Sequence, residues 1–412
     1  MTLASGSAGA QVIITCSMPI LSRLYNPEAF GGVAFFMSVT AILGVLSTFR
    51  YELAIPLSRD NESAANLLAL NGLIAVAVCI VSIPVVVLGQ HYFDLGSSGV
   101  SELLIVIGVP LAVFGSGGLR SLTFWATRGK HFKLISVGQV VRSSIVALVQ
   151  IAGGLAGLGA NGLIIGRMTG LFSSTGVVAF YMLRKEIRWM LEVVEAKKIK
   201  ALAREYSVFP KYNLPRALLN TTSQSVTSLL LVFFFDPAVA GLYWFAFRLL
   251  QMPISLIGDA VRRVFYQRAI EIHHAAGNLT GLFTKATLAM FALAVGPVMV
   301  IVLFGPALFG FVFGEDWVRA GEYSQWLVIG WSITFGNVPS VMLIPVLNLQ
   351  KLALVIDAIK VVLQCLAIPA AAYFGSDMLA IAAFSAVTIV ANAFLIGYIY
   401  IHVRRQKNAL PA

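Results

Sequence analysis

The chain has 412 residues, of which 58% are hydrophobic and only 11% are charged, and its formal net charge is +11. A soluble domain carries roughly a quarter charged residues, so this composition excludes an ordinary soluble fold and indicates an integral membrane protein. The basic residues fall in short connectors between long apolar runs, which favours an orienting role for the charge over nucleic-acid binding.

A helix of roughly 20 apolar residues crosses the hydrocarbon core of a bilayer. The first apolar run has no positively charged leader and holds Gln11, so we interpret it as a spanning helix and not as a cleaved signal peptide. The sequence predicts twelve spans in all, at residues 2–22, 30–49, 64–89, 102–126, 133–156, 161–183, 207–235, 239–261, 281–304, 323–348, 352–374 and 378–401.

The connectors predict the orientation of the chain. With a cytoplasmic N-terminus, the outer connectors hold only Arg23 and Arg319 among the basic residues. This asymmetry follows the positive-inside rule and predicts that both termini are cytoplasmic. The basic residues expected inside are Arg50, Arg59, Arg128, Lys130, Lys133, those between 184 and 211, Arg262, Arg263, Arg268, Lys351, Arg404, Arg405 and Lys407.

Two pairs of similar segments predict an internal repeat. "YNPEAFGGVAF" (25–35) and "FDPAVAGLYWF" (235–245) share Asn or Asp before Pro, Gly four residues after the Pro, and Phe four residues after that Gly. "KLISVGQVVR" (133–142) and "KLALVIDAIK" (351–360) then open the fifth span and the eleventh. We therefore expect two all-α, six-helix lobes related by a pseudo-twofold axis along the membrane normal, with a cavity between them.

The expected lobes comprise residues 1–183 and 207–412, and residues 184–206 form a cytoplasmic linker. The linker mixes Trp189 and Leu191 with many charged residues, so it is either an amphipathic helix on the inner leaflet or a plain connection. Cys16, Cys79 and Cys365 lie in apolar runs without metal-ligand spacing, which predicts small buried side chains and no disulfide, metal or cofactor site.

Several cations lie inside the predicted spans. Lys133 and Lys351 mark the cytoplasmic surface, and nine further residues at about 1.5 Å each place Arg142 and Lys360 about 13 to 14 Å deep, near the midplane. A charge at that depth usually faces protein or water because hydrocarbon disfavours it. The predicted substrate-binding residues, which would attract an anion, are Arg142, Lys360, Arg248, Arg167 and Arg216.

Simpler roles stay open for some of these residues. Asp357 and Lys360 are spaced to pair on one helix face. Arg216 is shallow enough for its side chain to reach the membrane surface.

The chain has no G-x-x-x-x-G-K-[ST] motif for binding ATP, so uphill transport would need an ion gradient or consumption of the product. The candidates for H⁺ or Na⁺ coupling are Asp357, Asp259 and Glu52, and Glu52 could equally pair with its neighbour Arg50.

Four segments resemble one known family: "PILSRLYNPEAFG", "FRYELAIPL" (49–57), "GLYWFAFRLLQMPISLIGDAVRRVFY" (241–266) and "FGEDWVRAGEY" (313–323). They look like the polysaccharide-transporter flippases, the Wzx-like translocases of O-antigen, lipopolysaccharide and exopolysaccharide synthesis, in the superfamily that also holds the MATE exporters. The resemblance covers nearly the whole chain, and it implies a MATE-like fold with a cationic central cavity.

The resemblance also implies a bacterial or archaeal inner-membrane protein. Such a protein would move an undecaprenyl-pyrophosphate-linked oligosaccharide to the outer leaflet, and its candidate partners would be a polysaccharide polymerase and chain-length machinery. A MATE-type drug or metabolite exporter is the first alternative, although acids and not cations would suit its cationic substrates. A membrane glycan polymerase or ligase is the second, and the short outer connectors disfavour it, so we expect a transporter and not an enzyme.

Overall fold

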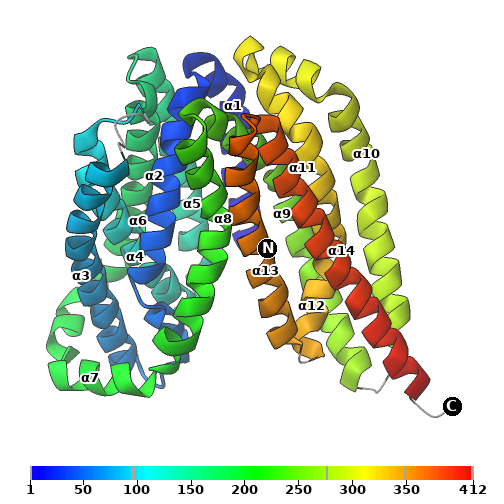
Figure 1. Cartoon of the computed structure of the whole chain (residues 1–412). Coiled ribbons are helices and arrows are strands. Elements are labelled where there is room, and N and C mark those ends of the chain that lie inside the picture. The colour runs from blue at the N-terminus through cyan, green and yellow to red at the C-terminus, as the bar shows by residue number, and fades with distance from the viewer. Residues whose placement is uncertain (1, 94–98, 275–276, 348, 410–412) are drawn as a thin grey trace. The chain divides into compact units, whose positions relative to one another are not determined.

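The computed structural model describes residues 2–93, 99–274, 277–347 and 349–409, and this part of the chain holds helices and no strand (Figure 1). The α-helices are α1 (Thr2–Leu24), α2 (Pro27–Leu46), α3 (Asn61–Phe93), α4 (Glu102–Arg128), α5 (Phe132–Leu155), α6 (Gly159–Val193), α7 (Ala196–Glu205), α8 (Leu214–Phe234), α9 (Pro237–His274), α10 (Leu279–Phe313), α11 (Val318–Gly336), α12 (Val338–Val346), α13 (Gln350–Tyr373) and α14 (Asp377–Ala409). Short irregular helical turns are η1 (Tyr51–Leu57), η3 (Phe209–Asn213) and η4 (Glu315–Trp317).

Each predicted span overlaps helix, and the all-helical membrane fold is confirmed. The span 323–348 is divided between α11 and α12, and its last residue lies outside the described part of the chain. Ten helical segments of the described chain are long and apolar enough to cross a bilayer. α1 and α9 are outside this set; α9 carries Arg248, Asp259 and Arg262 along its length. The count of twelve spans therefore stays a prediction.

Packing divides the chain into two compact units, Met1–Gly241 and Leu242–Ala412. The division falls inside α9, because α8 packs against α2 in the first unit. The expected lobes, with their boundary at 184–206, follow the sequence repeat and not this packing, and they remain a prediction. Within unit 1 the main pairs are α5 with α6, α1 with α5 and α3 with α4; within unit 2 they are α10 with α11, α13 with α14 and α11 with α14.

The two copies of the Asn/Asp-Pro motif meet inside unit 1. Asn26 caps α2 by accepting a hydrogen bond from the Ala29 N–H at 3.0 Å. Asp236 accepts one from the Ala238 N–H at 2.7 Å, so each copy begins a helix at its proline.

The glycines of the two motifs make this meeting possible. A Cβ added at Gly31 would overlap the carbonyl oxygen of Pro237, and one added at Gly241 would overlap the carbonyl oxygen of Pro27. The contact is reciprocal, backbone against backbone, and only glycine fits at either position.

α5 and α6 pack through a row of small residues. Gly162, Gly166 and Gly170 recur every four residues on one face of α6. A Cβ at Gly166 would collide with the Gln150 side chain, and one at Gly170 would lie 2.9 Å from the carbonyl oxygen of Arg142. This is the small-xxx-small pattern that lets spanning helices approach closely in lipid.

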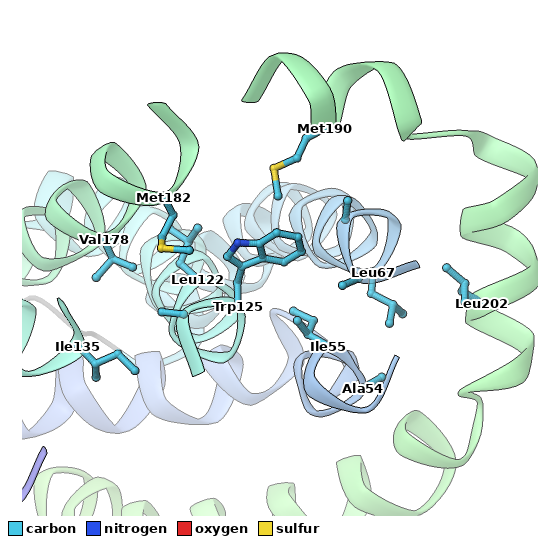
Figure 2. Close-up of a cluster of buried hydrophobic side chains, with 13 residues drawn as sticks. Ala54, Ile55, Leu67, Leu122, Trp125, Ile135, Val178, Met182, Met190 and Leu202 are labelled. Atoms are coloured by element: carbon cyan, nitrogen blue, oxygen red, sulfur yellow. The ribbon is translucent and has the colours of Figure 1, made fainter. Parts of the chain in front are cut away.

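A buried cluster closes one end of unit 1. Trp125 lies at its centre, next to Leu122 and Ile55, with Met190 of α6 above it and Met182 of α6 to its left in the view of Figure 2. The Trp125 indole N–H donates to Glu186 Oε2 at 3.1 Å, which satisfies its polar atom. The cluster anchors η1, so part of the "FRYELAIPL" segment belongs to the core.

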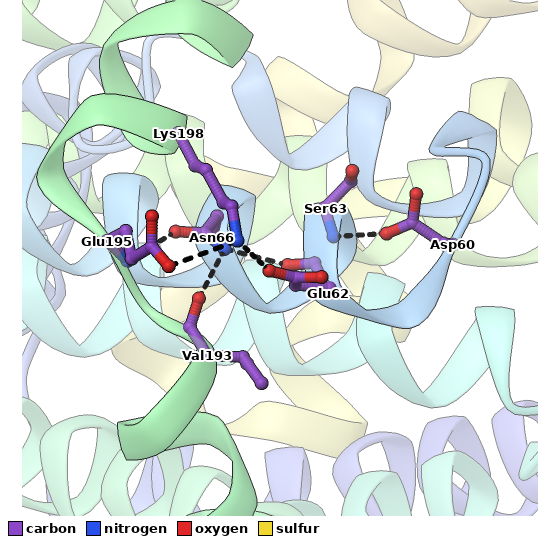
Figure 3. A network of polar contacts seen from close by, with 7 residues as sticks. All are labelled: Asp60, Glu62, Ser63, Asn66, Val193, Glu195 and Lys198. Carbon is purple, nitrogen blue, oxygen red and sulfur yellow. Dashed lines mark hydrogen bonds and ion pairs between the residues drawn. The ribbon is translucent and has the colours of Figure 1, made fainter.

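The expected linker is ordered structure. α6 continues to Val193, the chain turns, and α7 lies across the ends of the neighbouring helices at the bottom of Figure 1. The fully buried Asn66 of α3 holds the corner, because it donates to the Val193 carbonyl at 3.0 Å and accepts from the Glu195 N–H at 2.9 Å (Figure 3). Lys198 pairs with Glu62 beside it. α7 is amphipathic, but its apolar side, with Leu202 in the cluster above, packs on protein, and a position on the inner leaflet stays a prediction.

We expect Asn66→Ala to loosen α7. The substitution leaves the Val193 carbonyl and the Glu195 N–H without partners, at a cost of about 1 to 3 kcal/mol. Hydrogen exchange of the α7 amides should rise while that of α5 stays unchanged. Asn220→Ala on the exposed side of α8 is the control, and equal exchange in both variants would contradict this role of Asn66.

In unit 2, Arg319 joins the starts of α11 and α14. Its guanidinium pairs with Asp377 at 2.7 Å and with Glu322 at 2.6 Å, and Tyr323 donates to the same Asp377 carboxylate. Trp317 is fully buried against Phe245, with ring centroids 4.1 Å apart. The "FGEDWVRAGEY" segment is therefore a structural clamp.

Candidate functional site

Arg142 lies on α5 at its contact with α6. Its Cγ atom would be 3.5 Å from a Cβ added at Gly170, so the arginine side chain packs against the row of glycines on α6. The side chain is half-buried. Arg142 therefore stands on a rigid helix pair, which suits a residue that must hold a charge at one place.

Arg167 lines a cavity of about 30 Å³ within unit 1. Ser17 of α1, Gln150 of α5 and apolar side chains form the rest of its wall. Gln150 donates to the Leu163 carbonyl at 2.8 Å, and Tyr25 donates to the Gln150 carbonyl at 2.6 Å, so both hold the wall in place. The space suits about one or two water molecules and is too small for a pyrophosphate.

Arg120 on α4 was missed by the sequence interpretation. It donates to the Gly44 carbonyl at 2.9 Å and is attracted by Glu52. Glu52 is fully buried, pairs with Arg50 at 3.1 Å, and accepts a hydrogen bond from Thr48 at 2.6 Å, so the alternative of an Arg50–Glu52 pair is confirmed. The sequence does contain a sign of this buried charge, because Arg120 interrupts the apolar run 102–126.

Backbone geometry supports this network. Phe49 and Arg50 have φ angles of 47° and 66°, a left-handed conformation that costs energy in non-glycine residues. The conformation brings Arg50 back over Glu52 at the start of η1. The role of Arg50 is therefore structural, because its guanidinium neutralises the buried carboxylate of Glu52.

In unit 2, Arg248 is largely buried on α9. Its Nε atom is buried and has no hydrogen-bond partner among the described residues. The aromatic rings of its neighbours Tyr243 and Phe247 pack against Phe384 and Trp331, and Tyr243 is buried. Asp259 is on the same helix, but its side chain lies outside the described part of the structure.

Lys360 and Asp357 form the ion pair that their spacing predicts, with Nζ 3.3 Å from Oδ1. The Asp357 side chain is 68% exposed, although α13 has a mean hydropathy of 2.0 over its apolar window. An exposed carboxylate inside so apolar a span needs water or protein beside it. This face of α13 is thus the best candidate in unit 2 for a hydrated surface.

The remaining site predictions fare differently. Arg216 is exposed in the first turn of α8, a position that leaves open both a binding role and a side chain reaching to the membrane surface.

Cys16 is exposed, so its predicted burial is wrong, because a spanning helix can turn small apolar side chains to lipid as well as inward. Arg142 and Arg167 lie on the paired helices α5 and α6, whereas Arg248 and Lys360 belong to unit 2.

Unit 2 also holds a polar chain that the sequence interpretation missed. Asn337 donates to Asn392 at 2.7 Å, Asn392 donates to Thr334 at 3.3 Å and to the Thr388 carbonyl, and Gln364 donates to Thr388. The network ties α11 and α13 to α14. Over the residues that the structure describes, no group of three or more His, Cys, Asp and Glu side chains could hold a metal ion.

The described chain is an all-helical, multi-pass membrane protein with a MATE-like fold and basic side chains within its helices. The chain belongs to the family of polysaccharide biosynthesis proteins, whose model matches residues 20–322. A comparison with the curated proteins finds no match.

Solved structures share the fold at low identity. A multidrug-resistance MATE family transporter in an inward-facing conformation is 13% identical, with a TM-score of 0.73 over 97% of this chain and 96% of that one. The lipid II flippase MurJ, inward closed, is 11% identical, with a TM-score of 0.68 over 97% and 89%. A MOP superfamily transporter from Pyrococcus furiosus Vc1 is 16% identical, with a TM-score of 0.59 over 98% and 94%.

Proposed function

We propose that the chain flips an undecaprenyl-pyrophosphate-linked oligosaccharide from the cytoplasmic to the outer leaflet, for the synthesis of a surface polysaccharide such as O-antigen or exopolysaccharide. One observation carries the proposal: in a member of a polysaccharide biosynthesis family, the described spans contain basic side chains in both units. Two described acids, Glu52 and Asp357, each pair with a basic neighbour on their own segment.

The chemistry suits a pyrophosphate. Guanidinium and ammonium groups replace its hydration shell with charge-assisted hydrogen bonds, and a hydrated path carries the sugars while the polyprenyl tail stays in lipid. Arg248 has a buried Nε that lacks a hydrogen bond among the described residues, and such a ligand could supply one. Arg142, Arg167, Arg216 and Lys360 would bind it at other points along the path.

A polarity argument separates this proposal from a drug exporter. The Pyrococcus furiosus transporter is described as having a binding pocket of reverse polarity that suggests a different function. In the present chain, the basic side chains of the spans favour an anionic substrate. The MATE-type exporter therefore remains the second candidate, on the strength of the shared fold alone.

The reciprocal glycine contact supplies a gate. By the positive-inside argument, Pro27 and Pro237 lie at the outer surface of an inner-membrane protein with cytoplasmic termini. The close approach of Gly31 to Pro237 and of Gly241 to Pro27 would then seal the outer end of the transport path, and the two helix starts would separate when substrate leaves.

Asp357 is the best-placed candidate for ion coupling, because its carboxylate is exposed inside a span.

The function is tested in proteoliposomes loaded with undecaprenyl-pyrophosphate oligosaccharide, where a membrane-impermeant glycosidase reports glycan exposure. We expect protein-dependent exposure, and a rate about tenfold lower in Arg142→Ala and in Lys360→Ala, because each loses one charge-assisted interaction. Arg142→Lys should keep most of the rate. Arg268→Ala, which removes an exposed arginine paired with Glu271, is the control.

The outcomes are distinct. Exposure that survives both alanine substitutions keeps the flippase and removes the cationic-site mechanism. If no exposure occurs and a cationic dye is exported instead, the exporter replaces the flippase.

A further inference from the structure

The part of α6 beyond its apolar span has two different faces. Met182, Glu186 and Met190 recur every four residues and face the Trp125 cluster. The opposite face, here named the α6 stripe, consists of Phe180, Arg184, Ile187, Arg188 and Leu191, at positions i, i+4, i+7, i+8 and i+11.

The α6 stripe is exposed and mixes apolar with basic side chains. Phe180 is 68% exposed, Ile187 40% and Leu191 73%. The Arg184 guanidinium lies 5.4 Å from the centre of the Phe180 ring, and Arg188 is exposed. Apolar side chains this exposed do not suit open water, and the two arginines do not suit hydrocarbon, so the stripe fits the boundary between the two.

The stripe continues a face of α6 that suits lipid. Within the apolar span Gly159–Met182, Ile165 and Phe172 are exposed, and nothing lies within 4 Å of the open side of Gly176. Arg184 and Arg188 then follow the end of the span by about 3 and 9 Å along the helix axis. That is about the depth of the headgroup layer.

α7 adds charge of the same sign. Its apolar side packs on protein through Leu202, whereas Lys197, Lys200 and Arg204 share the exposed side. Lys198 already has Glu62 and Glu195 as partners. The exposed surface of this region also carries Glu192, Glu195 and Glu205, but its basic side chains outnumber these acids.

We propose that the α6 stripe, with the basic side of α7, binds anionic phospholipid headgroups of the adjoining leaflet. Each arginine or lysine near such a surface favours binding, and Ile187 and Leu191 add apolar contact. An acidic soluble protein would match the charge, but it would not explain the exposed apolar side chains Ile165, Phe172 and Phe180 that precede the stripe on α6. The surface is separate from the proposed transport residues, so its test is independent of transport.

Native mass spectrometry of the full chain in detergent, titrated with phosphatidylglycerol or phosphatidylcholine, tests the proposal. We expect the wild type to prefer phosphatidylglycerol, and R184E/R188E to bind it at least about tenfold more weakly. R404E/R405E, which reverses an exposed basic pair on α14, is the charge-matched control and should retain the preference. An R184Q/R188Q variant provides a milder change should the glutamates disturb folding.

A second measurement places the stripe against the bilayer. A nitroxide at Ile187→Cys, in a chain without its native cysteines, should be more accessible to oxygen than to a water-soluble nickel complex in phosphatidylglycerol vesicles. The proposal is overturned if the two lipids bind equally, if R184E/R188E binds like the control, or if the nickel complex reaches position 187 freely. The last result would point to a soluble acidic partner.

Discussion

Gly31→Leu is expected to reduce glycan exposure in proteoliposomes to the protein-free background. A side chain at this position meets the Pro237 carbonyl, which is backbone and cannot turn away. The helices must therefore stay apart, and the proposed outer seal cannot form. Gly241→Leu should act alike, because its side chain would meet Pro27 in the same manner.

A distance measurement separates a lost seal from a lost fold. Nitroxides at Glu28 and Ala238, one residue after each proline, should report a short distance that lengthens in Gly31→Leu. Gly72→Leu is the matched control, since a Cβ there has nothing within 4 Å. Normal transport by Gly31→Leu would show that the contact is not a gate, and equal loss in the control would show that leucine itself harms the chain.

Glu52→Ala is expected to destabilise unit 1 by about 3 kcal/mol. The carboxylate is fully buried, and its removal leaves the Arg50 guanidinium and the Thr48 hydroxyl without their partner and Arg120 without a nearby opposite charge. Glu52→Gln should lie in between, because it keeps a hydrogen-bond acceptor for Thr48. Unfolding of the purified variants by heat or denaturant in detergent measures the change.

Glu271→Ala gives the comparison for an exposed pair. Its partner Arg268 is 66% exposed, so the expected loss is below about 1 kcal/mol. A Glu52→Ala protein with wild-type stability would refute the structural role. If such a protein also lost the dependence of transport on a proton or sodium gradient, Glu52 would be the coupling site.

The helical fold was predictable because spanning helices need long apolar runs, and each expected range overlaps helix. The break between α11 and α12 at Asn337 was not predicted, because the segment 323–348 is apolar enough on average to be taken as one span. The packing of α8 on α2 was hidden as well, because lipid-facing and protein-facing surfaces of a spanning helix have similar compositions.

The candidate site was predictable in part. Spacing predicted the Asp357–Lys360 pair, which is confirmed. The binding role that depth counting gave to Arg142 and Lys360 stays a prediction. Arg120 needed knowledge of which helix lies beside η1, and the Asn337–Asn392 contact joins residues 55 positions apart. Partners that lie far apart in the sequence cannot be predicted from the spacing of neighbouring residues.

The glycine row between α5 and α6 bears on the order in which the chain assembles during synthesis. The two helices are consecutive and are joined by a tight turn in which Gly157 and Gly159 have φ angles of 69° and 53°. A hairpin this local can close as soon as both helices have left the ribosome, before α8 exists to pack on α2. Arg142 and Arg167 would thus enter the bilayer on a hairpin that has already formed, and the cost of placing each cation in lipid alone would not arise.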